Sequence, residues 1–249
     1  MSIRIKIAAS ILTIVLAVFT IAGCKKKTEP AKVQETGTVT DVDGNTYKTI
    51  KIGDQWWMAE NLRVTKYRNG TALFTLQASE TDSAWGQKTK GYYCMFYNNP
   101  DNKNKYGFLY NWFAISDTNN IAPAGWHVPS DTEWKELEIY LGMSDADGVN
   151  WRGGHEGDKL KVSSPEDWTT YGSIWSTNES GFTARAGCCR LFNGTWGFPA
   201  TGNTGFWWTS SLRSVSNEAW YRYLDYKRSG VFRYYGSKTY GMSIRCVKD

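Results

Sequence analysis

The sequence predicts one α+β domain over residues 37–249, with strands toward both ends and the best-defined helix between them. Residues 38–52 alternate with a two-residue period around a turn, and strand-like runs return after residue 205. The segment 131–141 has clear helical periodicity, and a stretch rich in Gly, Ser, Asn and Asp, 143–204, follows it. Strands grouped apart from helices are typical of α+β folds.

Residues 1–23 have the features of a bacterial lipoprotein signal peptide, in the right order. Arg4 and Lys6 give a positive start, and the apolar run 7–21 is too short for a comfortable transmembrane helix. The run ends in Ile-Ala-Gly-Cys, which resembles a lipobox, so Cys24 is predicted to carry a diacylglycerol. An ordinary secretory signal with an incidental cysteine is the alternative.

Residues 24–36 are polar and unpatterned, and we expect a lipidated flexible linker there. The acyl chains would anchor the protein to a membrane, on the periplasmic side or at the cell surface, with the outer membrane favoured. Residues 1–36 carry +4 of the formal charge of +5, which leaves +1 for 37–249. A domain of that charge lacks the basic field that attracts phosphate backbones, so nucleic acid is not an expected partner.

Alternating residues predict the first strands. The runs 38–42 and 45–52 flank an Asp-Gly pair, and Gly tolerates the positive φ of a tight hairpin turn. A third strand is expected over 55–59. A buried strand is expected over 92–97, and 106–115 is interpreted as a helix, although its density of aromatic residues also fits a strand.

The helix over 131–141 is predicted from its ends as well as from its periodicity. Ser130 is a suitable N-cap, and Glu133 lies three residues on, where it completes a capping box. Gly142 is a plausible C-terminal stop. One face of the helix carries the apolar side chains Trp134, Leu137 and Leu141.

Four more strands are expected near the end of the chain, over 206–210, 219–224, 231–234 and 242–247. A Lys-Arg-Ser-Gly turn at 227–230 joins the second of them to the third.

Five ordered motifs of this sequence resemble a known family. They are Val-Asp-Gly-Asn-Thr-Tyr at 42–47, Trp-Met-Ala-Glu-Asn-Leu at 57–62, Tyr-Gly-Phe-Leu-Tyr-Asn-Trp at 106–112, Gly-Trp-His-Val-Pro-Ser-Asp-Thr-Glu-Trp at 125–134 and Ser-Ile-Arg-Cys-Val at 243–247. The family is the Fibrobacter succinogenes major paralogous domain, which is common in lipoproteins of the Bacteroidetes and Fibrobacteres. The resemblance spans about 38–248 and implies no established activity.

The segment 125–134 and the closing strand are also similar to the superfamily of formylglycine-generating enzymes and C-type lectin-like domains. That resemblance implies a C-type lectin-like fold. In it, two helices flank small antiparallel sheets, the first and last strands pair, and a long loop region carries binding.

Four cysteines remain beyond the lipobox, and an exported protein is expected to form disulfides. They are Cys94, Cys188, Cys189 and Cys246, which allow three pairings. A bridge between the adjacent Cys188 and Cys189 is disfavoured by its strained ring. The resemblance to relatives implies a Cys94–Cys246 bridge.

The known chemistries of the superfamily lack residues in this chain, so a non-catalytic protein is expected. The generating enzymes use two cysteines near the closing strand, where Cys246 stands alone. The related iron enzymes need three histidines, and this chain has only His127 and His155. No metal site or cofactor is expected, although calcium would suit a C-type lectin-like loop. A cryptic enzyme remains an alternative.

The long loop region is the predicted binding surface. Aromatic faces can stack on sugar rings and amides can bond their hydroxyls, which points to a glycan or a protein ligand. The candidate residues are Trp151, Trp168, Trp175, Asn178, Asn193 and Trp196. Two alternatives are that these tryptophans fill the core, and that the protein is a structural or adhesion component of the cell envelope.

Overall fold

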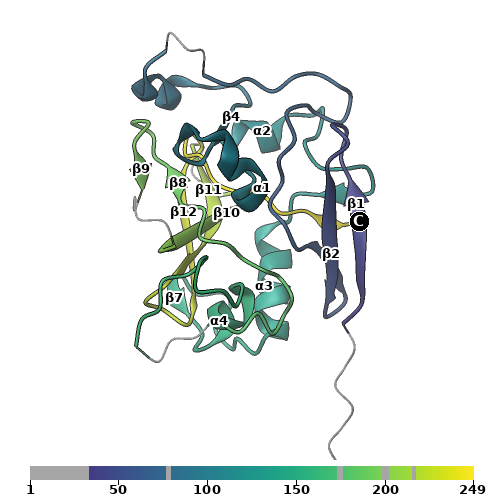
Figure 1. Ribbon diagram of the computed structural model, residues 1–249, viewed down its shortest axis with the longest axis vertical. Helices are drawn as coiled ribbons and strands as arrows, with labels where there is room; N and C mark the ends of the chain where they lie inside the picture. The colour runs from purple at the N-terminus through teal and green to yellow at the C-terminus, as the bar shows by residue number, and fades with distance from the viewer. Residues whose placement is uncertain (1–33, 77–79, 173–175, 198–201, 215–216) are drawn as a thin grey trace, which may run out of the picture. The chain divides into compact units, whose positions relative to one another are not determined.

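The computed structural model describes residues 34–249 except 77–79, 173–175, 198–201 and 215–216 (Figure 1). Gln34–Asp249 form one compact unit, built mostly of small antiparallel sheets with a few short helices. The predicted α+β class is therefore confirmed. Among the described residues, no helix has both the length and the apolar character that a membrane crossing requires.

The described residues form short strands, α-helices and 3₁₀ helices. The strands are β1 (Thr36–Thr40), β2 (Thr46–Ile52), β3 (Gln55–Met58), β4 (Tyr93–Met95), β5 (Phe108–Tyr110), β6 (Trp126–His127), β7 (Asn150–Arg152), β8 (Cys189–Arg190), β9 (Trp196–Gly197), β10 (Thr204–Leu212), β11 (Glu218–Asp225), β12 (Val231–Ser237) and β13 (Val247–Lys248). The α-helices are α1 (Lys103–Tyr106), α2 (Phe113–Ser116), α3 (Asp131–Tyr140) and α4 (Glu156–Leu160). Short 3₁₀ helices are η1 (Asp82–Gln87), η2 (Phe96–Asn98) and η3 (Pro100–Asn102).

One sheet contains both ends of the compact unit, with the described strands in the order β1-β2-β3-β13-β6. The predicted β1–β2 hairpin is present, and Gly44 in its turn has a φ of +82°. The carboxylate of Asp41 closes this turn because it accepts the backbone N–H groups of Asp43 and Asn45, each at 2.9 Å. The expected pairing of the first and last strands is wrong, since β13 pairs with β3 and β6 instead.

The second main sheet has the order β10-β11-β12-β7 among the described residues, all antiparallel. The strands predicted over 206–210, 219–224 and 231–234 are its first three members. Its edge strand, β7, comes from inside the segment that was expected to be a long loop. That segment also contains α4, β8 and β9.

Helix α3 lies between the two sheets (Figure 1). The predicted capping box is present: the Ser130 hydroxyl accepts the Glu133 N–H at 3.2 Å, and the Glu133 carboxylate accepts the Ser130 N–H at 2.7 Å. The predicted apolar face is buried. The largest hydrophobic cluster joins Ile50, Trp57, Trp134, Leu137, Leu141, Trp207, Leu224 and Val231, which come from α3 and both sheets.

The helix expected over 106–115 is wrong. The chain instead forms strand β5, which pairs with β4, and then the single turn α2. Phe108, Leu109 and Tyr110 are all buried, so pairing with β4 and burial on both faces override the weak helical pattern of the segment.

The predicted Cys94–Cys246 disulfide is absent from the structure, where both of these cysteines are free and buried. Cys94 packs with Trp85 and Leu109, whereas Cys246 belongs to a different hydrophobic cluster that includes Tyr110. The two thiols therefore serve as small apolar side chains in separate parts of the core.

Candidate functional site

The sheet β10-β11-β12-β7 has one aromatic face, because every second residue of each strand points the same way. One row crosses all four strands: Phe206 lies opposite Tyr223, Tyr223 opposite Phe232, and Phe232 opposite Trp151. A second row joins Trp208, Tyr221 and Tyr234. Cross-strand aromatic pairs of this kind stabilise a sheet and give its face a continuous apolar surface.

This face is closed at one end and open at the other. Phe206 and Trp208 on β10 are buried beneath Trp112 and Met242. Further out, four side chains are half-buried, and we call them the aromatic platform: Trp151, Tyr221, Phe232 and Tyr234. Their rings are in contact, with centroids 5.2 Å apart for Trp151–Phe232, 5.6 Å for Phe232–Tyr234 and 6.5 Å for Tyr221–Tyr234.

Polar groups lie at the edge of the aromatic platform. The Arg228 guanidinium, in the β11–β12 turn, lies 5.7 Å from the centre of the Trp151 ring. Burial raises the pKa of the Tyr221 hydroxyl, so this group keeps its proton and stays a hydrogen-bond donor at neutral pH. The platform therefore combines flat apolar rings with a few fixed donors.

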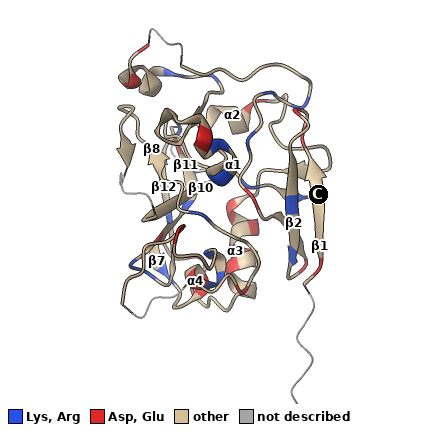
Figure 2. Cartoon of the chain, in the orientation of Figure 1, with Lys and Arg blue, Asp and Glu red and all other residues tan. Residues whose placement is uncertain are grey.

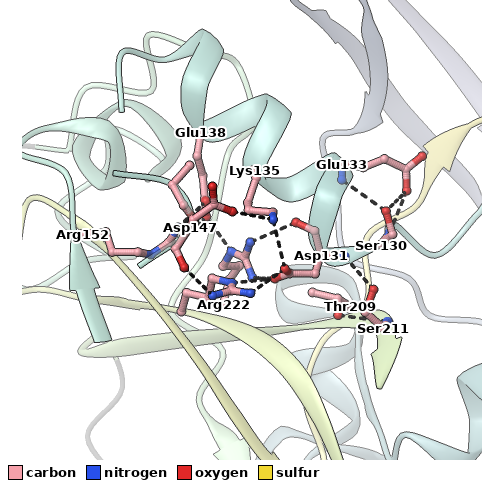
Figure 3. A network of polar contacts seen from close by, with 12 residues as sticks. Ser130, Asp131, Glu133, Lys135, Glu138, Asp147, Arg152, Thr209, Ser211 and Arg222 are labelled. Carbon is pink, nitrogen blue, oxygen red and sulfur yellow. Dashed lines mark hydrogen bonds and ion pairs between the residues drawn. The ribbon is translucent and has the colours of Figure 1, made fainter. Parts of the chain in front are cut away.

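The opposite face of the same sheet carries buried arginines (Figure 3). Arg222 on β11 donates to Asp131 at 2.8 Å and to Glu138 at 2.5 Å, both on α3. Arg152 on β7 makes a two-pronged contact with Glu138 at 2.8 and 2.9 Å. Because these groups are buried and paired with one another, they hold α3 on the sheet and are closed to a ligand.

Of the predicted tryptophans that the structure describes, Trp151 belongs to the aromatic platform, whereas Trp168 and Trp196 do not. Trp168 is only 3% exposed, and its indole N–H donates to the Ala184 carbonyl at 2.8 Å. Trp196 is half-buried and packs against Phe96 and Arg190. Trp175 lies outside the described residues. The structure thus distributes these side chains over separate clusters.

The two predicted asparagines serve local turns. Asn178 has a φ of +52°, and its side-chain oxygen accepts the Thr183 N–H at 2.8 Å. The Asn193 side chain accepts the N–H and the hydroxyl of Thr195 at 3.1 and 2.7 Å. The amide oxygen of each asparagine is thus occupied by a neighbouring loop residue, so both side chains stabilise their local loops.

The histidines have different surroundings. His127 lies between two carboxylates, with its Nδ1 2.6 Å from Asp249 and its Nε2 2.7 Å from Glu133. His155 is largely exposed, 3.6 Å from Asp158. No group of three or more His, Cys, Asp or Glu side chains among the described residues is arranged to hold a metal ion.

A polar pocket of about 170 Å³ lies apart from the aromatic face. Its charged lining consists of Lys48, Glu60, Lys105, Arg185 and Arg245, with Asn61 beside them. Sequence reasoning missed this pocket. Asn61 and Arg245 did carry a signal, because each is a polar residue inside an otherwise largely apolar motif, at 57–62 and 243–247.

The aromatic platform was only partly predictable. Tyr221 and Tyr223 alternate with Arg222, and Phe232 and Tyr234 flank Arg233, so an aromatic face and an arginine face could have been derived from strands that were correctly placed. The partnership with Trp151 could not, because it depends on β7 joining the sheet edge.

The chain thus forms an α+β domain with a half-open aromatic sheet face and a separate charged pocket. Residues 50–248 match the family described as Fibrobacter succinogenes major domain, and the chain belongs to that family. No curated protein and no solved structure matches the chain.

Proposed function

We propose that this chain is a non-catalytic binding module of a lipid-anchored extracytoplasmic protein, and that the aromatic platform binds a glycan. The observation that carries the proposal is the contact of four half-buried aromatic rings on one open sheet face. Single, partly exposed apolar side chains are common on proteins, whereas several in contact on one face of a sheet are typical of an interaction surface.

The chemistry of the platform suits sugars better than a charged polymer. Flat rings can stack on the apolar C–H face of a pyranose, while Tyr221, Tyr234 and Arg228 offer hydrogen bonds to its hydroxyl groups. In the view of Figure 2, Lys and Arg are interspersed with Asp and Glu along the described chain. A neutral ligand with alternating apolar and hydroxyl surfaces fits this arrangement.

The remaining parts of the proposal rest on sequence and topology. The signal features of residues 1–23 support a lipid anchor at Cys24, although both lie outside the described residues. Two features support a C-type lectin-like fold: the last strand lies in the same sheet as the first, and the long segment between α3 and β10 contains only short elements among its described residues.

A glycan array probed with the full chain in detergent tests the proposal, once with calcium and once with chelator. Trp151→Ala is expected to weaken any hit at least about tenfold, because a tryptophan side chain often dominates the binding energy of an interface. The matched control is Tyr171→Ala, an exposed aromatic outside the platform. The chelator arm shows whether calcium takes part.

Two outcomes would contradict the proposal that the aromatic platform binds a glycan. Equal binding by Trp151→Ala and the unmodified chain would place the glycan elsewhere on the protein. A blank array in both arms would instead favour a structural role in the envelope, and affinity purification of a protein partner through the same face would then be the next measurement.

A further inference from the structure

The pocket near Arg245 is assembled from segments that are far apart in the sequence. Lys48 comes from β2, Glu60 and Asn61 from the turn after β3, Lys105 from α1, and Arg185 from the segment before β8. Arg245 enters from the chain just before β13. In Figure 2, blue stretches of the ribbon on β2 and α1 mark lysine positions on these two elements.

Arg245 is 1% exposed, and no carboxylate of the described residues lies within ion-pair distance of it. Its guanidinium donates to the Asn61 side chain at 2.9 Å and to the carbonyls of Phe182, Thr183 and Met58, the last two at 2.8 and 3.5 Å. These four bonds leave one of its five N–H donors without an acceptor. A buried charge held only by neutral oxygens is costly.

The surroundings add to that cost. Burial and, to a smaller extent, the positive charge of Arg185 lower the pKa of Arg245 to about 9, while Glu60 opposes the effect. By contrast, two equally buried arginines of the sheet β10-β11-β12-β7 have carboxylate partners. Arg222 contacts Asp131 and Glu138, and Arg152 contacts Glu138. Arg245 therefore has a buried positive charge that an anion from outside the protein could neutralise.

The pocket has a surplus of positive charge around Arg245. Its lining contains four cations and a single carboxylate, Glu60. Behind the lining, Asp167 pairs with Lys105 at 3.1 Å and with Arg185 at 2.5 Å, and so offsets one further charge. Two positive charges remain uncompensated at a site of restricted solvent access, where electrostatic interactions are stronger than in water.

We propose that this pocket binds the carboxylate of a small hydroxy acid, with Arg245 and Arg185 holding the carboxylate and Glu60 accepting a hydroxyl of the same molecule. Arg245 can donate its remaining N–H to one carboxylate oxygen, and the partly exposed guanidinium of Arg185 can donate to the other. Glu60 would repel a doubly charged anion such as phosphate, but it is a suitable acceptor for a hydroxyl group.

The size of the pocket limits the ligand. Its volume of about 170 Å³ is below the roughly 300–1,000 Å³ of sites for drug-sized molecules, so it takes one small unit. A uronic acid has the required combination of one carboxylate and several hydroxyls. It could arrive free or as the end of a chain, and the pocket does not overlap the aromatic platform.

Isothermal titration of the full chain in detergent with glucuronate, glucuronamide and glucose tests the proposal. Glucuronamide is the matched ligand, because it keeps the shape and the hydroxyls and loses only the charge. We expect heat of binding for glucuronate, at least about tenfold weaker binding for the two neutral molecules, and an affinity that falls with added salt. A reducing-end conjugate of a glucuronate-terminated disaccharide distinguishes a chain end from the free acid.

Variants of the lining residues test whether the measured heat comes from binding at this pocket. Arg185→Gln and Lys105→Gln each remove one partly exposed cation and are expected to weaken glucuronate binding about tenfold, while Lys248→Gln, an exposed lysine outside the pocket, leaves it unchanged. Arg245→Lys should abolish binding, and a thermal melt shows whether that variant is folded. If Arg245→Lys does not fold, the Arg185 and Lys105 variants alone show whether the pocket binds glucuronate.

The proposal fails if glucuronate and glucuronamide bind equally, if neither binds, or if the pocket variants behave like Lys248→Gln. Sulfate that displaces glucuronate at equal concentration would also overturn it, because the site would then select charge and not a carboxylate. Binding of a neutral glycan at the aromatic platform is independent of all these results, so the two proposals can fail separately.

Discussion

Arg222 and Arg233 lie directly opposite each other on neighbouring strands, and both donate to the same oxygen of Asp131 at 2.8 Å. Like charges placed opposite each other in a sheet repel. Asp131, the first residue of α3, therefore holds together a pair that would otherwise destabilise the sheet, and Glu138 does the same for Arg222 and Arg152 two turns later (Figure 3). The helix and the sheet depend on each other through these contacts.

The first prediction concerns this network. Asp131→Asn is expected to lower the free energy of unfolding by about 3–5 kcal/mol, because it leaves the buried guanidinium of Arg233 without its counterion and Arg222 with Glu138 alone. Urea denaturation followed by circular dichroism measures the change. The control is Asp147→Asn, whose exposed carboxylate pairs with Lys135 at 2.8 Å and should have no measurable effect. Equal stability of the two variants would show that the network does not hold α3 in place.

The second prediction is the acid limit of stability. Burial alone raises the pKa of Asp131, but hydrogen bonds and charge from Arg233 and Arg222 outweigh it and bring the pKa to about 2, below the ordinary 3.8. A lowered carboxylate pKa stabilises the fold above the ordinary value, and this contribution is lost as the pH falls from about 3.8 through 2. Melting temperatures between pH 5 and 2 should therefore fall less steeply in Asp131→Asn than in the unmodified chain.

The third prediction concerns the opposite end of the pH range. Partial burial lowers the pKa of His127, but the contacts with Asp249 and Glu133 outweigh it and raise the pKa above the ordinary 6.5. A raised histidine pKa contributes stability that is complete below 6.5 and is lost as the pH rises through the raised value. Melting temperatures from pH 6 to 9 should show this loss, and His127→Gln should remove it. An identical profile for the variant would mean that the two carboxylates do not hold the imidazolium.

The fourth prediction separates two tryptophans of the same sequence segment. Trp168→Ala is expected to cost about 3–5 kcal/mol, because it empties a core position and removes the bond to Ala184. Trp151→Ala is expected to cost less than about 2 kcal/mol, because the ring is half-buried at a sheet edge. Chemical denaturation measures both, and the reverse order would place Trp151 in the core and argue against the aromatic platform.

The fifth prediction concerns the lipid anchor. Cys24→Ala removes the thiol that would receive the diacylglycerol, so the protein should leave the membrane fraction or keep its signal peptide. Membrane fractionation with metabolic labelling by a radioactive fatty acid measures both results. Cys188→Ala is the control for loss of a cysteine. Labelling that persists in Cys24→Ala would contradict the lipobox interpretation.

Local sequence patterns were sufficient wherever the deciding interactions are local. Ser130 and Glu133 close the capping box within four residues, and Gly44 provides the positive φ of the first hairpin turn. The segment 106–115 shows where such patterns fail. Its apolar residues fit a helix as well as a strand, and only pairing with β4 makes residues 108–110 a strand.

By itself, the sequence determined the α+β class, the family, helix α3 with its cap, the first hairpin and three of the strands in the second sheet. The tertiary structure decided which strand joins the edge of that sheet, and so brought Trp151 to Phe232. It also brought Arg245 into hydrogen-bonding contact with Asn61, although the two residues are 184 positions apart in the sequence. The physical reason is the range of the interactions: caps, turns and periodicity depend on neighbours a few residues away, whereas strand order and a shared pocket depend on how distant segments pack together.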